Sequence, residues 1–345
     1  MKTYLQARRL WLAALLLSLL PVASTAALAA NTLQGGRIVA NAFGDTRIPA
    51  IPQRVVTLYQ GATDSAVALG ITPVGVVDSW LEKPMYRYLR DALASVEHVG
   101  LETQPNLEKV AWLDPDLIVA TRFRHERVKP LLEKIAPTVA TDTVFDFKAT
   151  LALMAEATGR EARARELMQH WDDRVANFRR QIADKLGDDW PQKAAVVRFK
   201  SDHVRIYSTG FAGSILSELG FEQPDALHDQ GWGMKLTSEE NIPVMNADVI
   251  FVLLEPDDPA IARNYRHWRS HPLWQRLDAV QSERVFEVDT VNWIMGGGIL
   301  AANAMLDDLY AHYGLDPRHE QASAASCAGA ASAVSHPRDA KATAC

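Results

Sequence analysis

Residues 104–120 read QPNLEKVAWLDPDLIVA, and they carry the pattern from which the fold can be predicted. The stretch indicates a helix that begins near Glu108, a short turn at Pro115, and then a buried strand formed by an apolar run. The same order recurs in the second half of the chain, where Glu240 precedes the apolar run 249–251 at the same spacing. A repeated helix–turn–strand unit predicts two topologically similar lobes that flank a cleft.

Short runs rich in Val and Ile, bounded by Pro, Gly or Asp, continue on both sides of this stretch. Most of them are separated by segments long enough for a helix, which is typical of α/β layers with mainly parallel strands. The predicted strands are 54–58, 73–77, 116–120 and 138–140 in the first half, and 194–198, 204–207, 248–254 and 284–288 in the second.

The middle of the chain differs, because no Gly or Pro occurs between Gly159 and Gly187. Here Trp171, Val175 and Phe178 fall three or four residues apart, which is the spacing of an amphipathic helix. Such a helix would span about 40 Å and would connect two lobes rigidly; an ordinary core helix is the alternative. The predicted fold class is α/β. Two Rossmann-like lobes are expected at residues 34–158 and 193–318, joined by a single long α-helix at residues 159–187, with the ligand cleft between the lobes.

The N-terminus has the parts of a secretory signal peptide. Three positive residues precede a nearly unbroken apolar run at 10–20, and residues 27–29, Ala-Leu-Ala, form a cleavage site. We therefore expect residues 1–29 to be cleaved and the protein to be secreted into the periplasm in soluble form; an uncleaved membrane anchor is the alternative. No Cys lies near the cut, so a lipoprotein is not expected.

The chain carries a formal net charge of −6, and removal of the three positive N-terminal residues lowers it to −9. A chain this acidic is a poor binder of nucleic acid, so we expect no nucleic-acid partner. Separately, we expect the protein to be a monomer. Residues 319–345 are rich in Ala and Ser without an apolar period, and we expect a disordered tail. The two cysteines, Cys327 and Cys345, lie in this tail, where an oxidising compartment would allow a disulfide.

Positive and aromatic residues follow the predicted strands, at the carboxyl ends where open α/β sheets bind ligands. In an acidic chain this indicates an anionic ligand, because arginine pairs with carboxylates through a planar fork of donors. Arg122 and Arg124 would share one face of an extended segment. Each of these side chains has an alternative in core packing, in pairing with a buried acid or in exposure to solvent. The predicted ligand-binding residues are Tyr59, Trp80, Arg122, Arg124, Arg198, Lys200, Tyr207, Trp232 and Trp293.

Over roughly residues 34–315 the chain resembles the helical-backbone (class III) periplasmic substrate-binding proteins, which serve ABC importers of ferric siderophores, haem and cobalamin. The stretch 104–120 carries this resemblance. The segments TRFRH at 121–125, HPLWQ at 271–275 and VDTVNW at 288–293 are most similar to ferric-dicitrate-binding proteins within that class.

The resemblance implies a binding protein that captures an anionic ferric chelate, either ferric dicitrate or another ferric siderophore, and delivers it to a permease dimer. The iron would arrive already chelated, so no cofactor of the protein's own is expected. In the family, one glutamate on each lobe pairs with arginines of the permease, and Glu108 and Glu240 match these positions. Their alternative is a purely local role as acids at helix N-termini.

Three other functional classes have partial signals in the sequence. Haem or cobalamin binding stays open, with Tyr59 or Tyr207 as an axial haem ligand. A zinc-binding protein or metalloenzyme would use His267 and His271, which are four residues apart, but no H-E-x-x-H motif or third ligand accompanies them. A nucleotide-binding enzyme could use Gly210-Phe-Ala-Gly-Ser214 as a phosphate loop, but this segment lacks the lysine of such a loop. A serine hydrolase is disfavoured because no G-x-S-x-G motif occurs. We therefore expect a protein that is not an enzyme.

Overall fold

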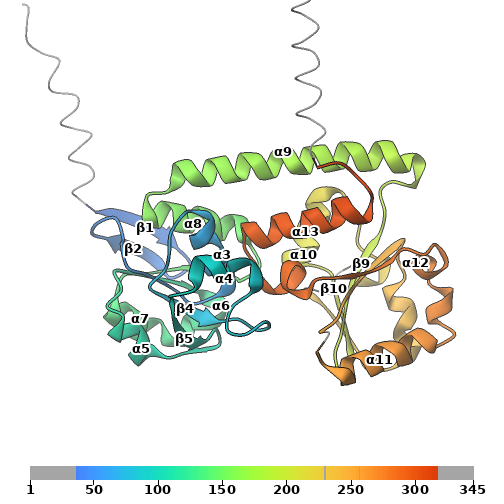
Figure 1. Ribbon diagram of the computed structural model, residues 1–345, viewed down its shortest axis with the longest axis horizontal. Helices are drawn as coiled ribbons and strands as arrows, with labels where there is room; N and C mark the ends of the chain where they lie inside the picture. Colours follow the sequence, from blue (N-terminus) through green and yellow to red (C-terminus); the bar gives the residue numbers. More distant parts are fainter. Residues whose placement is uncertain (1–35, 229–230, 256, 318–345) are drawn as a thin grey trace, which may run out of the picture.

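The computed structural model describes residues 36–228, 231–255 and 257–317. Two α/β lobes lie side by side under one long helix, α9 (Glu161–Leu186) (Figure 1). The predicted two-lobed α/β fold with a long helix after Gly159 is therefore confirmed. The predicted signal peptide at 1–29 and the tail at 319–345, with both cysteines, lie outside the described residues.

The N-terminal lobe is built on a six-stranded sheet in the order β6-β5-β4-β3-β7-β8, in which only the pairing of β5 with β6 is antiparallel. All four strands predicted for this half are present; the remaining two strands and the β1–β2 hairpin were not predicted. The strands are β1 (Arg37–Asn41), β2 (Gly44–Ile48), β3 (Val55–Thr57), β4 (Gly75–Asp78), β5 (Glu97–Leu101), β6 (Gln104–Pro105), β7 (Leu117–Thr121) and β8 (Thr138–Thr141). The α-helices are α3 (Gln60–Ala68), α4 (Arg90–Leu93), α5 (Leu107–Trp112), α6 (Arg122–His125), α7 (Lys129–Ile135) and α8 (Phe147–Thr158).

The C-terminal lobe contains a five-stranded sheet in the order β11-β10-β9-β12-β13. Its strands are β9 (Ala194–Phe199), β10 (Val204–Tyr207), β11 (Gly233–Leu236), β12 (Val249–Leu253) and β13 (Val285–Val288), and its α-helices are α10 (Gly210–Leu219), α11 (Pro259–Ser270), α12 (Asp278–Gln281) and α13 (Ile299–His312). The pairings in the two large sheets are mainly parallel, as expected, but β10 is antiparallel to both of its neighbours. Only residues 200–203 separate β9 from β10, a length that suits a hairpin, whereas a parallel pair needs a crossover of a dozen residues or more.

Helix α9 belongs to the core of both lobes. Its stripe of Trp171, Val175, Phe178 and Ile182 is buried in the largest apolar cluster, which also contains side chains from β3, β7, β9 and β12. The ring of Phe178 lies edge-on to Tyr310 of α13, with 5.4 Å between ring centroids. The helix therefore holds the lobes together through apolar packing along its length.

Helix α13 is tied to the N-terminal lobe, although its sequence position falls in the predicted second lobe. Asp64, buried on α3, accepts hydrogen bonds from the backbone nitrogens of Leu300 (2.9 Å) and Ala301 (3.0 Å) at the start of α13, and from the hydroxyl of Tyr88 (2.9 Å). A carboxylate at this position satisfies donors that the first turn of a helix leaves unpaired.

Two glycines allow this close approach. A Cβ on Gly298 would lie 2.3 Å from the Cγ of Asp64, and a Cβ on Gly61 would lie 2.5 Å from the carbonyl oxygen of Gly297. The bare Gly296–Gly298 run therefore has a packing role, because it lets the chain before α13 reach α3.

The pH dependence of stability should show this buried carboxyl. Burial raises the pKa of Asp64 to about 6, against the hydrogen bonds from α13 and Tyr88, which lower it. Because the folded pKa lies above the ordinary value, the folded state binds the proton more tightly, and stability falls as pH rises from about 4 to 6. The unfolding free energy of the wild type relative to Asp64→Asn should fall by about 3 kcal/mol over this window.

Urea unfolding at pH 4, 5, 6 and 7 measures this difference. The exposed Asp91 provides the control, since Asp91→Asn should show no such trend. A difference between wild type and Asp64→Asn that stays constant with pH would contradict the prediction.

No helix in the described part of the chain is long and apolar enough to cross a bilayer.

Candidate functional site

A cavity of about 620 Å³ lies between the lobes and is lined by residues of both. The N-terminal lobe contributes chiefly Trp80, Glu102, Phe123, Arg124 and Phe145. The C-terminal lobe contributes chiefly Arg198, Lys200, Tyr207, Trp232 and Glu255. The segment before α13 completes the wall with Ile294, Met295 and Gly296, part of which forms a π-helical turn at Val291–Met295.

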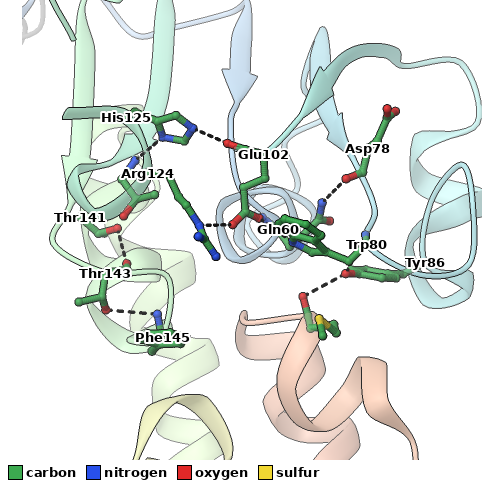
Figure 2. A network of polar contacts seen from close by, with 12 residues as sticks. Gln60, Asp78, Trp80, Tyr86, Glu102, Arg124, His125, Thr141, Thr143 and Phe145 are labelled. Carbon is green, nitrogen blue, oxygen red and sulfur yellow. Dashed lines mark hydrogen bonds and ion pairs between the residues drawn. The ribbon is translucent and has the colours of Figure 1, made fainter. Parts of the chain in front are cut away.

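Glu102 organises the N-terminal half of this cavity. Its carboxylate is only 4% exposed and accepts hydrogen bonds from the Nε of Arg124, the Nε1 of Trp80 and the backbone nitrogen of Gln60, each at 3.3 Å (Figure 2). Burial raises the pKa of Glu102, although the charge of Arg124 and these hydrogen bonds act in the opposite direction. Glu102 thus holds the guanidinium of Arg124 in place through the Nε of that arginine.

His125 supports Glu102 from the core side. Its Nε2 lies 2.9 Å from the carbonyl oxygen of Glu102, and the backbone nitrogen of Thr121 lies 3.2 Å from its Nδ1 (Figure 2). Since the amide of Thr121 can only donate, Nδ1 accepts and Nε2 carries the proton. Burial lowers the pKa of His125, which keeps the ring neutral. This histidine is structural.

Aromatic rings surround Arg124. Its guanidinium carbon lies 4.7 Å from the ring centre of Phe123 and 5.9 Å from that of Trp80. The rings of Phe123 and Phe145 are 6.0 Å apart. Stacking on aromatic faces holds a guanidinium in place while its remaining N–H groups stay available to a ligand.

In the C-terminal lobe, Glu255 pairs with both cations that the sequence predicted. Its Oε1 accepts from the Nζ of Lys200 at 2.7 Å and from the Nη2 of Arg198. Burial by itself would raise the pKa of Glu255, but the hydrogen bonds and charges of Lys200 and Arg198 outweigh it and lower the pKa. The carboxylate is therefore ionised at neutral pH.

Two aromatic residues complete this side of the cavity. The rings of Tyr207 and Trp232 are 5.8 Å apart, and the guanidinium carbon of Arg205 lies 5.1 Å from the ring centre of Trp232. Trp232 is half exposed and lines the cavity.

The described cavity wall thus carries three cations and two carboxylates. Arg124 comes from one lobe, and Arg198 and Lys200 from the other, while Glu102 and Glu255 each hold the cations of their own lobe. The balance is one net positive charge, within a chain whose formal net charge is −6. A concave site with aromatic side chains and converging cations suits an anionic guest.

Six of the nine predicted ligand-binding residues line this one cavity: Trp80, Arg124, Arg198, Lys200, Tyr207 and Trp232. The placement expected for the other three needs correction. Residues 122–125 form helix α6 and not an extended segment, so Arg122 and Arg124 point in different directions. Arg122 is 51% exposed and pairs with Asp142.

Tyr59 and Trp293 are buried in the core and do not line the cavity. The hydroxyl of Tyr59 bonds to Thr141 at 3.0 Å and Thr150 at 3.2 Å, which excludes it as an axial haem ligand in this arrangement. The ring centres of Trp293 and Phe251 are 4.5 Å apart, and the Nε1 of Trp293 donates a hydrogen bond to Asp308 at 2.9 Å. Both follow a strand, but each side chain points back into the apolar layer.

Glu102, Phe123, Phe145 and Glu255 were not predicted. Glu102 follows β5, whose sequence, EHVGL, lacks the apolar run that identified the other strands. Glu255 does carry a usable signal, since it lies two residues after β12, but a prediction built on positive and aromatic residues at strand ends does not include a carboxylate.

The alternative metal site finds no support in the geometry. No group of three or more His, Cys, Asp or Glu within the structurally described ranges could hold a metal ion. The Nε2 of His267 instead lies 2.9 Å from the Oε1 of Glu239, and His271 caps the end of α11.

The two predicted docking glutamates are exposed. Glu108 lies in the first turn of α5, on the side of the N-terminal lobe away from α9 in Figure 1. The predicted helix at Glu240 is a 3₁₀-helix, Glu239–Met245, with Pro243 inside it. A proline has no N–H to donate and is unfavourable inside an α-helix.

Comparison with known proteins agrees with this geometry. The chain matches the family model described as periplasmic binding protein over residues 55–291. It is 54% identical over 261 residues to the achromobactin-binding periplasmic protein of Dickeya dadantii, which covers 75% of this chain and 86% of that protein. It is 27% identical over 278 residues to the Fe(3+) dicitrate-binding periplasmic protein FecB of Escherichia coli, covering 78% of this chain and 88% of that one.

Among solved structures, SirA of Staphylococcus aureus complexed with staphyloferrin B is similar with a TM-score of 0.79 and 44% identity, over 81% of this chain and 99% of SirA. The resemblance to ferric-dicitrate-binding proteins is thus real, but the identity to the achromobactin-binding protein is twice as high. The chain therefore belongs to the periplasmic binding protein family.

Proposed function

We propose that this protein captures an anionic ferric chelate in the cavity between its lobes and delivers it to the permease of an ABC importer. The observation that carries the proposal is the convergence of Arg124 from one lobe and Arg198 and Lys200 from the other on a single aromatic-walled cavity.

The chemistry of such chelates fits this wall. Ferric complexes of carboxylate ligands present negative oxygens on their outer surface, and a guanidinium can pair with two of these oxygens at once. One charge pair at about 4 Å contributes on the order of 4 kcal/mol before desolvation, so two or three suffice for tight capture. Trp80 and Trp232 can cover the apolar parts of the chelate. The iron needs no protein ligand, because the chelate already coordinates it.

The ligands of the relatives support the same function. The compared proteins bind achromobactin, Fe(3+) dicitrate and staphyloferrin B, and a ferric siderophore is the ligand class that we assign to this chain. We further propose that residues 1–29 direct the protein to the periplasm, that the protein acts as a monomer without catalysis, and that Glu108 and Glu240 contact the permease dimer.

Fluorescence titration tests the ligand class. We expect saturable quenching of tryptophan emission by ferric complexes of carboxylate chelators, in a panel that also contains ferric hydroxamates, ferric catecholates and haem. The double variant Trp80→Phe/Trp232→Phe should lose most of the response, because both rings lie on the cavity wall. Trp112→Phe is the matched control, since Trp112 is exposed on α5, away from the cavity.

Absence of quenching by every ferric complex would refute the proposal. A shifted and sharpened Soret band on haem titration would instead support the haem alternative and contradict an anionic ferric chelate.

A further inference from the structure

Glu255 occupies the position where a ligand carboxylate would be expected. It lies two residues beyond β12, and the register of β12 with β9 places Leu253 beside Arg198. One of its two carboxylate oxygens, Oε1, accepts hydrogen bonds from both Arg198 and Lys200, as a carboxylate of a bound chelate would. Glu255 and Arg198 are 19% and 13% exposed, so this pairing is partly shielded from water.

The pairing leaves Arg198 only partly used. The Nε of Arg198 is buried and has no hydrogen-bond partner among the residues that the structure describes. A buried donor without an acceptor is unfavourable, and a guest that supplies an oxygen would relieve it. Arg198 is therefore held by Glu255 on one edge and remains unsatisfied on another.

The charge of Glu255 also acts on the whole cavity. Without this carboxylate, the described wall would carry three cations against Glu102 alone, and its net charge would rise by one unit. An anionic chelate must thus overcome the repulsion of Glu255 and compete with it for the donors of Lys200 and Arg198. A neutral chelate experiences little of this repulsion, because the interaction energy scales with the charge of the guest.

We propose that Glu255 is a specificity-determining residue, an internal carboxylate that competes with an anionic ligand for Arg198 and Lys200 and so weakens the binding of anionic chelates relative to neutral ones of similar size. This inference rests on the proposed function and deepens it. It assigns to Glu255 a limit on the advantage that the cations of the cavity give to highly charged ferric chelates over neutral ones of similar size, at some cost in absolute affinity for the charged chelates.

The test compares Glu255→Gln with the wild type by calorimetric titration, using ferric dicitrate as the anionic probe and a neutral ferric tris-hydroxamate as the second probe. The glutamine keeps an oxygen that can accept from Arg198 or Lys200 but removes the charge. Binding of ferric dicitrate should strengthen by about tenfold or more, because one repulsive unit charge a few ångströms away is removed. Binding of the neutral probe should change by less than about twofold.

Glu283→Gln is the matched control, because it removes the same charge from an exposed position in the same lobe outside the cavity. It should leave both affinities unchanged. Unchanged or weaker binding of ferric dicitrate by Glu255→Gln would overturn the inference, as would equal strengthening for both probes, which would indicate a looser cavity rather than a charge effect. If neither the wild type nor Glu255→Gln binds any ferric chelate, the proposed function fails instead.

Discussion

Replacing Arg124 by alanine should weaken binding of an anionic ferric chelate by about a hundredfold, which corresponds to about 2.7 kcal/mol. Two effects add. The ligand loses a guanidinium that Glu102, Phe123 and Trp80 hold in place at the cavity wall. Glu102 also loses its positive partner, and its buried negative charge would then face the incoming anion. Calorimetric titration with the chelate that binds the wild type best measures the loss.

Arg122→Ala provides a control from the same helix. Arg122 is two residues away and equally charged, but it pairs with Asp142 at the surface and does not line the cavity. It should change the affinity by less than about twofold. Arg124→Lys should fall in between, since lysine keeps the charge but not the planar fork. Equal losses for Arg122→Ala and Arg124→Ala would mean that only the overall charge of the protein matters.

Reversing both docking charges should abolish iron uptake while leaving chelate binding intact. In the variant Glu108→Lys/Glu240→Lys, the attraction to permease arginines that we propose would become repulsion at two points about one lobe apart. An exposed pair contributes at most about 1 kcal/mol, so each single reversal should reduce uptake only in part. Uptake of radioactive iron by cells that express the permease, measured beside the chelate affinity of the purified variant, separates delivery from capture.

A double reversal on α9 is the matched control. Glu166 and Asp172 are exposed on that helix, which lies on the opposite side of the N-terminal lobe from α5 (Figure 1). Glu166→Lys/Asp172→Lys should sustain normal uptake. Loss of chelate affinity in step with uptake for Glu108→Lys/Glu240→Lys would show that these glutamates support folding or binding, not docking.

The fold could be predicted wherever an apolar period was strong. The eight predicted strands and the long helix after Gly159 are all present, because continuous Val and Ile runs and an uninterrupted amphipathic stripe are compatible with few alternative structures. Short or polar elements were missed: β6 has two residues, and β5 reads EHVGL. Tertiary contacts, and not local pattern, define such strands.

The site was predictable in its charge but not in its detail. Strand ends indicated Arg124, Arg198 and Lys200, and all three line the cavity, because the topology of an α/β sheet brings these ends together. The direction of a side chain after a strand depends on the first turn that follows, which is why Tyr59 turns into the core and Arg122 turns to solvent. The sequence left pairing with a buried acid open but did not identify Glu102 or Glu255 as the partners of these cations.

The central claim is that cations of both lobes hold one anionic ferric chelate in one cavity. An anomalous difference map at the iron edge, from crystals grown with the best-binding chelate, tests it most directly. We predict an iron peak inside the cavity, with chelate oxygens within hydrogen-bond distance of Arg124 from one lobe and of Arg198 or Lys200 from the other. Iron located on the outer surface, or a chelate in the cavity that touches none of these three side chains, would contradict it.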